Sequence, residues 1–147
     1  MYARGTILGL TRGTRKSHLV RAALESIAYQ VCDVVKAMTA DSRLRLKEIR
    51  VDGGASANNF LREFQADMLG VRLSRPRLGE TTALGAAYLA GLTIGFWKDR
   101  AEIASLRQGD RFFLPGAERE NYRALYRGWQ RALKRSKHWL KQEEAEK

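Results

Sequence analysis

Two stretches of the sequence stand out for chemistry, and the first is a glycine pair between an expected strand and an expected helix. Residues 49–52 read as a strand that runs directly into Gly53 and Gly54. Paired glycines let a backbone turn sharply and approach a ligand with no Cβ in the way. The helix that follows presents unpaired N–H groups and the positive end of its dipole, which suits a phosphate. The stretch is neither a Walker A loop nor a dinucleotide fingerprint, so an ordinary turn stays open beside nucleotide binding.

The second stretch is a helix expected over residues 80–91, rich in alanine and interrupted by Gly85 and Gly91. Glycine inside a helix costs roughly 1 kcal/mol relative to alanine. The two glycines therefore indicate that another backbone packs very closely there. Packing of the helix on a sheet, with no ligand involved, explains the same pattern, so neither stretch decides a function alone.

The elements that position these stretches follow from apolar periodicity, and strands alternate with helices along the chain. Residues 5–11 read as a short strand, which leads through a polar loop to a helix with Ser17 as its N-cap. Gly70 ends the helix after the glycine pair, and residues 71–74 form a strand stopped by Pro76. This alternation predicts an α/β fold.

Two of the expected helices, the one that begins at Ser17 and the one after the glycine pair, should each bury one apolar side. In the helix after the glycine pair, that side is formed by Phe60, Leu61, Phe64, Met68 and Leu69. In the helix that begins at Ser17, the expected core stripe steps by threes and fours. It consists of Val20, Leu24, Ile27, Val31, Val34 and Met38, flanked by Cys32 and Val35.

The composition limits the class of protein. Of 147 residues, 44% are hydrophobic, and Cys32 is the single cysteine, so the composition is that of a cytoplasmic protein without an internal disulfide. No apolar run reaches the roughly 20 residues of a membrane span. The net charge of +11 makes nucleic acid a partner to consider, and such binding would weaken steeply with salt. Basic residues gather in segment 116–141, however, where their spacing predicts an amphipathic helix with a solvated basic face, so nucleic acid is the less favoured partner.

Several short motifs follow one another in a fixed order and are together far more specific than either stretch alone. They are Gly5-x-Ile7-x-Gly9-Leu10, His18-Leu19-x-x-Ala22-Ala23-Leu24-Glu25, Val51-Asp52-Gly53-Gly54-Ala55-Ser56-Ala57-Asn58-Asn59-Phe60-Leu61, Phe64-Gln65-Ala66-Asp67 and Glu80-Thr81-Thr82-Ala83-Leu84-Gly85-Ala86-Ala87-Tyr88-Leu89-Ala90-Gly91. This series resembles the FGGY family of carbohydrate kinases, and within that family the glycerol kinases. The resemblance covers essentially the whole chain.

The resemblance implies an actin-like (ribonuclease H-like) ATPase domain, present only in part. Residues 1–147 would be the family's C-terminal domain, truncated on its N-terminal side. The glycine pair would be the adenosine motif, which binds ATP or ADP with Mg²⁺. Gly54 would contact the nucleotide through its backbone and Asn58 through its side chain, while Gly53 and Ala55 would shape the turn. The helix over residues 80–91 would pack at the hinge between domains.

The resemblance also implies that parts of a complete kinase lie outside this chain. The phosphate-binding hairpin, the glycerol-binding residues and the catalytic aspartate are missing, so no catalytic and no metal-ligating residue is assigned here. Asp52 is not expected to act as a substitute base. Glycerol would be phosphorylated only with the missing N-terminal domain, in cis or in trans. The chain alone is expected to be inactive and to form a homo-oligomer through its uncovered sheet edge and apolar face. A fragment of another FGGY polyol or sugar kinase and a non-catalytic nucleotide-binding remnant remain as alternatives.

Overall fold

The computed structural model describes residues 3–77, 79–106, 111–116, 119–137 and 139. Within these ranges, strands alternate with helices, as the sequence predicts. The elements in chain order are α1 (Lys16–Ser42), β1 (Glu48–Arg50), the 3₁₀ helix η1 (Gly54–Ala57), α2 (Asn59–Leu69), β2 (Arg72–Arg75), α3 (Thr81–Thr93), α4 (Arg100–Ser105), β3 (Arg111–Phe113) and α5 (Arg119–Ser136).

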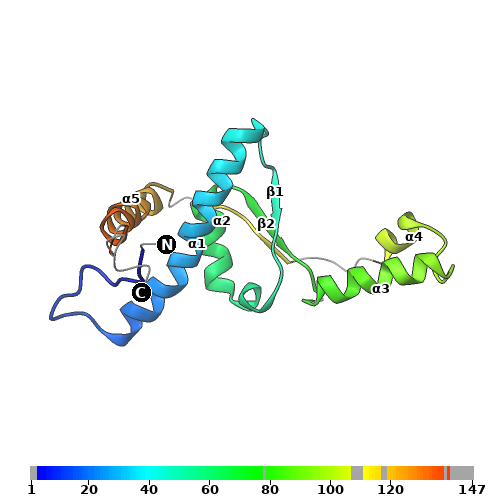
Figure 1. The fold of residues 1–147 in the computed structure, drawn as a ribbon, viewed down its shortest axis with the longest axis horizontal. Coiled ribbons are helices and arrows are strands. Elements are labelled where there is room, and N and C mark those ends of the chain that lie inside the picture. The colour runs from blue at the N-terminus through cyan, green and yellow to red at the C-terminus, as the bar shows by residue number, and fades with distance from the viewer. Residues whose placement is uncertain (1–2, 78, 107–110, 117–118, 138, 140–147) are drawn as a thin grey trace, which may run out of the picture.

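The three strands form a small sheet in the order β1-β2-β3. β1 and β2 run parallel, with Ile49 opposite Leu73, and α2 provides the crossover between them (Figure 1). β3 is antiparallel to β2 and places Phe113 opposite Leu73. Gly70 ends α2 with a left-handed φ of 64°, as predicted for a C-terminal glycine. The strand predicted over residues 71–74 is β2, shifted by one residue.

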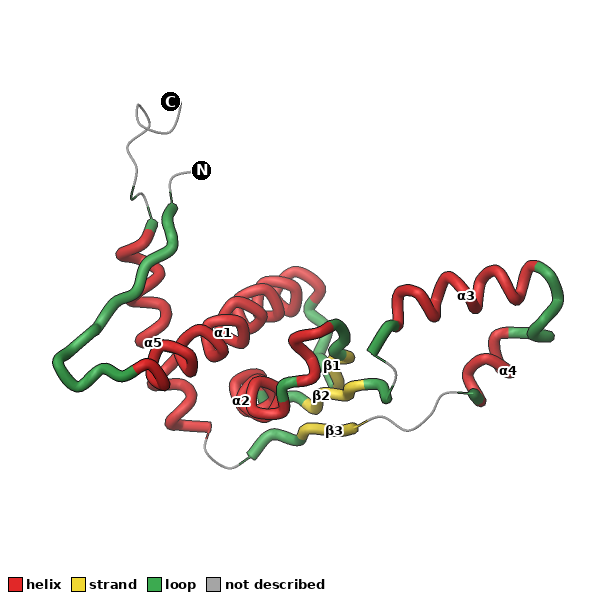
Figure 2. Tube along the Cα trace, turned by 90° about the horizontal axis from the view of Figure 1, so that it is seen from below, coloured by secondary structure: helices red, strands yellow, loops and turns green. Residues whose placement is uncertain are grey.

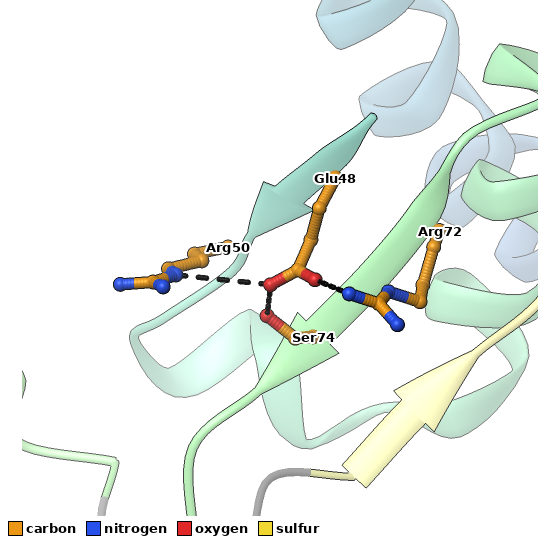
Figure 3. Close-up of polar contacts among 4 residues, drawn as sticks. All are labelled: Glu48, Arg50, Arg72 and Ser74. Atoms are coloured by element: carbon orange, nitrogen blue, oxygen red, sulfur yellow. Dashed lines mark hydrogen bonds and ion pairs between the residues drawn. The ribbon is translucent and has the colours of Figure 1, made fainter. Parts of the chain in front are cut away.

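A carboxylate on β1 links the two parallel strands. Glu48 accepts a hydrogen bond from Ser74 Oγ at 2.7 Å and forms an ion pair with Arg72, both on β2 (Figure 3). Arg50 Nε lies 3.7 Å from the same carboxylate. The hydrogen bond from Ser74, followed by that from Arg72, lowers the pKa of Glu48. Side chains therefore support the register of this strand pair in addition to its backbone hydrogen bonds.

The largest packed cluster joins α1, α2 and α5 (Figures 1 and 2). The ring of Tyr29 on α1 meets Phe64 edge-on and stacks on Trp129, each at a centroid distance of 5.6 Å. Asp33, one turn further along α1, accepts hydrogen bonds from Trp129 Nε1 at 3.0 Å and from the Tyr126 hydroxyl. These contacts hold the last helix of the fold against the first one.

The buried face of α1 is not the one that the periodicity predicted. Val34 and Met38, from the predicted stripe, are 58% and 62% exposed, whereas Ala28, Tyr29 and Cys32 are buried. Both faces of this helix carry apolar residues, so spacing alone cannot decide between them. α2 and α5 pack on the face of Tyr29 because it meets the aromatic rings of both helices. Of the other residues in the predicted stripe, Leu24 and Val31 are half-buried, whereas Val20 and Ile27 are exposed.

Two further expectations near the N-terminus are wrong. Residues 5–11 form no strand, and Ile7 and Leu10 in this segment are 66% and 59% exposed. A strand needs a neighbour for its backbone hydrogen bonds, and none of the described strands pairs with this segment. α1 begins at Lys16 rather than after Ser17, and Arg15 occupies the N-cap position. The N–H of Arg15 donates to His18 Nδ1 at 3.1 Å, so the side chain of His18 helps to close the start of the helix.

α3 and α4 form a hairpin that projects away from the sheet (Figures 1 and 2). A Cβ at Gly91, the one buried residue of α3, would lie 2.1 Å from the ring of Trp97. A Cβ at Gly85 would meet no atom within 4 Å. The expected close approach of another backbone is therefore wrong within the described residues, because a side-chain ring fills the space at one glycine and the other faces open space.

The helix predicted over residues 116–141 corresponds to α5, Arg119–Ser136. Residues 117–118, 138 and 140–141 of the predicted range lie outside the described residues. The packed side of α5 carries Tyr126 and Trp129, and its basic side exposes Arg127, Arg131 and Lys134. No helix in the described part of the chain is long and apolar enough to cross a membrane.

Candidate functional site

The glycine pair lies where β1 ends and the chain turns toward α2. Gly53 precedes η1 with a φ of 83°, a conformation that favours glycine. Gly54 has open space on its Cβ side, with no atom within 4 Å. Gly53, Gly54 and Ala55 are exposed, whereas Ser56 is buried. The turn therefore presents its backbone to solvent while its inner side is anchored.

Asn58 connects this turn to α2. Its Oδ1 accepts a hydrogen bond from the N–H of Leu61 at 3.0 Å, which makes Asn58 the N-cap of the helix. The bond orients the side chain and leaves its amide NH₂ group as a donor toward solvent. α2 has 11 residues, so the positive end of a substantial helix dipole lies beside the turn.

Asp52 connects the turn to α3. One of its carboxylate oxygens accepts a hydrogen bond from the N–H of Gly53 at 2.6 Å, and the other accepts from the hydroxyl of Thr81 at the start of α3. Both oxygens are thus occupied by groups of the chain itself. This geometry makes Asp52 a link between the turn and α3.

Arg75, at the end of β2, holds the inner side of the turn. Its Nη1 atom lies 2.7 Å from the carbonyl oxygen of Ser56, 3.0 Å from that of Ala57 and 3.1 Å from Asn59 Oδ1. The guanidinium also lies over the ring of Phe113, 5.4 Å from its centroid. Arg75 thereby ties the turn to the sheet.

Arg62, on α2, holds the same turn from a second direction. Its Nη2 donates to the carbonyl of Ala55 at 3.2 Å, and its Nη1 donates to Gln65. Arg62 is only 6% exposed, and its Nε has no partner among the described residues. Burial, together with the neighbouring charge of Arg75, lowers the pKa of Arg62. Sequence analysis does not single out either arginine, because a guanidinium that binds main-chain carbonyls leaves no recognisable motif.

A cleft of about 540 Å³ opens next to the turn, at the carboxyl ends of β1 and β2. This is the edge at which open α/β sheets bind ligands, and the volume is in the range of small-molecule sites. α3 and α4 form its other wall, where Gly85 leaves room by lacking a side chain. Other lining residues are Val51, Asp52, Pro76, Thr81, Tyr88 and Ile103.

The structure brings the predicted site residues Gly53, Gly54, Ala55 and Asn58 together in a single turn beside this cleft. The residues present fit a nucleotide, since this one turn offers an exposed glycine backbone, an amide donor and a helix N-terminus. Of the turn and its flanks, it is Asp52, directly before Gly53, that lines the cleft itself. Their contacts with a nucleotide stay a prediction. The described residues contain no group of three or more His, Cys, Asp or Glu side chains that could hold a metal ion.

Similar solved structures define the class of protein. The crystal structure of Plasmodium falciparum glycerol kinase with ADP matches with a TM-score of 0.80 and 34% identity, covering 92% of this chain and 27% of that one. A ligand-bound xylulose kinase from Lactobacillus acidophilus matches with a TM-score of 0.70 and 26% identity, over 90% of this chain and 28% of that one. The fold is therefore the actin-like ATPase fold of the sugar kinases, present as a partial domain.

Residues 2–94 match the C-terminal domain of the FGGY family of carbohydrate kinases, and the chain belongs to this family. The glycerol kinase of Alkaliphilus oremlandii is 56% identical over 98% of this chain and 29% of its own length. Glycerol kinase 2 of Thermotoga maritima is 59% identical over 96% of this chain and 28% of its own length. The chain thus spans less than a third of these relatives and corresponds to their C-terminal part.

Proposed function

We propose that this chain is the nucleotide-binding C-terminal portion of a glycerol kinase, an enzyme that transfers a phosphoryl group from ATP to glycerol. The observation that carries the proposal is the exposed backbone of Gly53 and Gly54, placed between the cleft and the N-terminus of α2. The relative from Plasmodium falciparum was solved with ADP, which supports ATP and ADP as the ligands of this turn. Glycerol is favoured over a sugar because the relatives at 55–59% identity are glycerol kinases.

Each residue of the turn has a separate part in this proposal. The backbone of Gly54 contacts the nucleotide, and the amide group of Asn58 donates a hydrogen bond near the adenosine. Gly53 and Ala55 shape the turn. Mg²⁺ would accompany the nucleotide and neutralise charge on its phosphates, held by groups outside this chain. The chain therefore supplies one wall of the site.

Catalysis needs more than this wall. Phosphoryl transfer depends on holding the nucleotide and the attacking hydroxyl in line, and a base must reach that hydroxyl. In the proposal, an N-terminal kinase domain supplies the base and the glycerol site, in cis or in trans, and residues 1–147 alone are inactive. The proposed setting is the cytoplasm. The exposed apolar side chains of α1, such as Val34 and Met38, favour self-association of the isolated chain.

Calorimetric titration with Mg-ADP tests the proposal, using Gly54→Val as the main variant. Because a Cβ at Gly54 meets no protein atom, the substitution should leave the fold intact while filling the space in front of the turn. We expect the wild-type chain to bind, and Gly54→Val to lose at least about tenfold in affinity. Gly5→Val is a matched control, since Gly5 also has open space around it and lies outside the site.

Three outcomes would contradict the proposal or a part of it. The turn would not be a nucleotide site if the folded wild-type chain did not bind Mg-ADP. The same would follow if Gly54→Val bound Mg-ADP as tightly as Gly5→Val. Formation of glycerol 3-phosphate from ATP and glycerol by the purified chain would show that the chain is not inactive alone.

A further inference from the structure

We infer that Arg75 is a positioning residue for nucleotide binding: by holding the carbonyl groups of Ser56 and Ala57, it fixes the direction in which the Gly54 backbone and the Asn58 amide point. The inference rests on the proposed function of the turn. It assigns a role to a side chain whose hydrogen bonds go to the turn and to Asn59, and in this role the side chain need not touch the nucleotide itself.

The carbonyl groups of the turn need donors. The 3₁₀ helix η1 has only four residues, and the last carbonyls of a helix have no partner within it. Ser56 is 4% exposed, so water cannot readily satisfy its carbonyl. The Nη1 atom of Arg75 lies 2.7 Å from this carbonyl and 3.0 Å from that of Ala57. One guanidinium nitrogen therefore closes the end of η1 directly before the N-cap Asn58.

The same nitrogen reaches the first residue of α2 as well, because Asn59 Oδ1 lies 3.1 Å away. Arg75, which belongs to β2, thus connects the turn to the start of α2 through its side chain. The side chain of Asn58 is anchored by the hydrogen bond that it accepts from the N–H of Leu61, and Arg75 acts on it through the backbone on either side. Without Arg75, Arg62 would still hold the carbonyl of Ala55, but the carbonyls of Ser56 and Ala57, directly before Asn58, would lose their donor.

Arg75 also brings charge to the site. Within the described residues, neither Arg75 nor Arg62 forms an ion pair with a carboxylate; the arginines that do are Arg21, Arg50 and Arg72. Two positive charges consequently lie behind the turn without a paired anion. Their field favours an anionic ligand on the open side, which a phosphorylated nucleotide provides.

Arg111 provides a matched control for Arg75. The two residues are paired in register on β2 and β3, and both guanidinium groups lie over Phe113, at 5.4 Å for Arg75 and 5.1 Å for Arg111. No described hydrogen bond joins Arg111 to the turn. Arg111→Met therefore removes a charge and a ring contact from the same part of the sheet and leaves the turn carbonyls satisfied.

The experiment combines titration with Mg-ADP and hydrogen exchange of the amides of residues 53–58. Arg75→Met should bind at least about tenfold more weakly than the wild type, because bonds to a charged donor are lost, and its turn amides should exchange faster. Arg75→Lys should recover part of the affinity, since an ammonium group carries three hydrogens for the same acceptors. Arg111→Met should bind within about twofold of the wild type.

The outcomes separate the two proposals. If the wild type binds and Arg75→Met binds equally well, or if Arg111→Met loses as much affinity as Arg75→Met, the positioning role is overturned while the nucleotide site stands. If the wild type does not bind, both proposals fall. Thermal unfolding of each variant shows whether it is folded, and rescue by Arg75→Lys distinguishes positioning of the turn from general loss of stability.

Discussion

α2 and α3 both follow the carboxyl end of a parallel strand, yet the chain holds them very differently (Figure 1). α2 is capped at both ends, by Asn58 and Gly70, and buries Leu61 and Phe64. α3 has no side-chain cap, buries only Gly91 among its residues and leaves its leucines partly or largely exposed. α2 is therefore part of the hydrophobic core of the described residues, whereas α3 is not.

The two helices differ in how far the described residues bury their apolar side chains. The helices α1, α2 and α5 pack their aromatic rings against one another and link polar groups between them, for example through the bonds that Asp33 accepts from Tyr126 and Trp129. α3 and α4 instead line one wall of the cleft and project from the body (Figure 2). Since the chain spans only 28–29% of its glycerol kinase relatives, we expect the rest of such an enzyme to cover this hairpin.

Truncation of one leucine in each helix should give the largest difference in effect between α2 and α3. Leu61 is fully buried and Leu89 is 69% exposed. Leu61→Ala should lower the free energy of unfolding by about 2–5 kcal/mol, because it leaves a cavity in the core, whereas Leu89→Ala should change it by less than about 0.5 kcal/mol. Urea unfolding followed by circular dichroism measures both. Equal effects would mean that α3 belongs to the same cooperative core as α2.

Capping provides a second, smaller contrast. Asn58→Ala removes the bond to Leu61 and should lower the free energy of unfolding by about 1 kcal/mol. Glu80→Ala, at the N-cap of α3, should have almost no effect because Glu80 makes no capping bond.

Asn58→Asp separates the two roles of this residue. Aspartate caps as well as asparagine but has no amide donor, so this variant should keep its stability and still lose affinity for Mg-ADP in a calorimetric titration. Retained affinity would show that the side chain serves α2 only.

The smallest effect on stability is expected for the contacts of Glu48 between β1 and β2, the strands that precede α2 and α3. The pKa of Glu48 is lowered by the hydrogen bond from Ser74 and then by Arg72, so its contribution to stability is present above the unfolded value near 4.5 and is lost as pH falls through the folded value. Glu48→Gln should flatten this loss in urea unfolding between about pH 6 and about pH 3. Glu63→Gln, which removes an exposed carboxylate that forms no ion pair with the described residues, is the control and should leave the slope unchanged.

Much of the site could be predicted because it depends on local chemistry. Local conformational preferences of neighbouring residues explain three features: the positive φ of Gly53, the end of α2 at Gly70 and the position of Asn58 at the start of a helix. The arginines that hold the turn could not be found in this way. Arg75 binds carbonyls 18 and 19 positions away, and such a contact exists only once β2 lies beside the turn.

By itself, the sequence determined the alternation of strands and helices, the glycine turn and the family, because each rests on local propensity or on the order of motifs. Only the tertiary structure decided which face of α1 is buried and that residues 5–11 form no strand. The physical reason is the same in both cases. A helix with two apolar faces buries the one that finds partners, here Ala28, Tyr29 and Cys32 against α2 and α5, and an extended segment becomes a strand only beside another strand that accepts its hydrogen bonds.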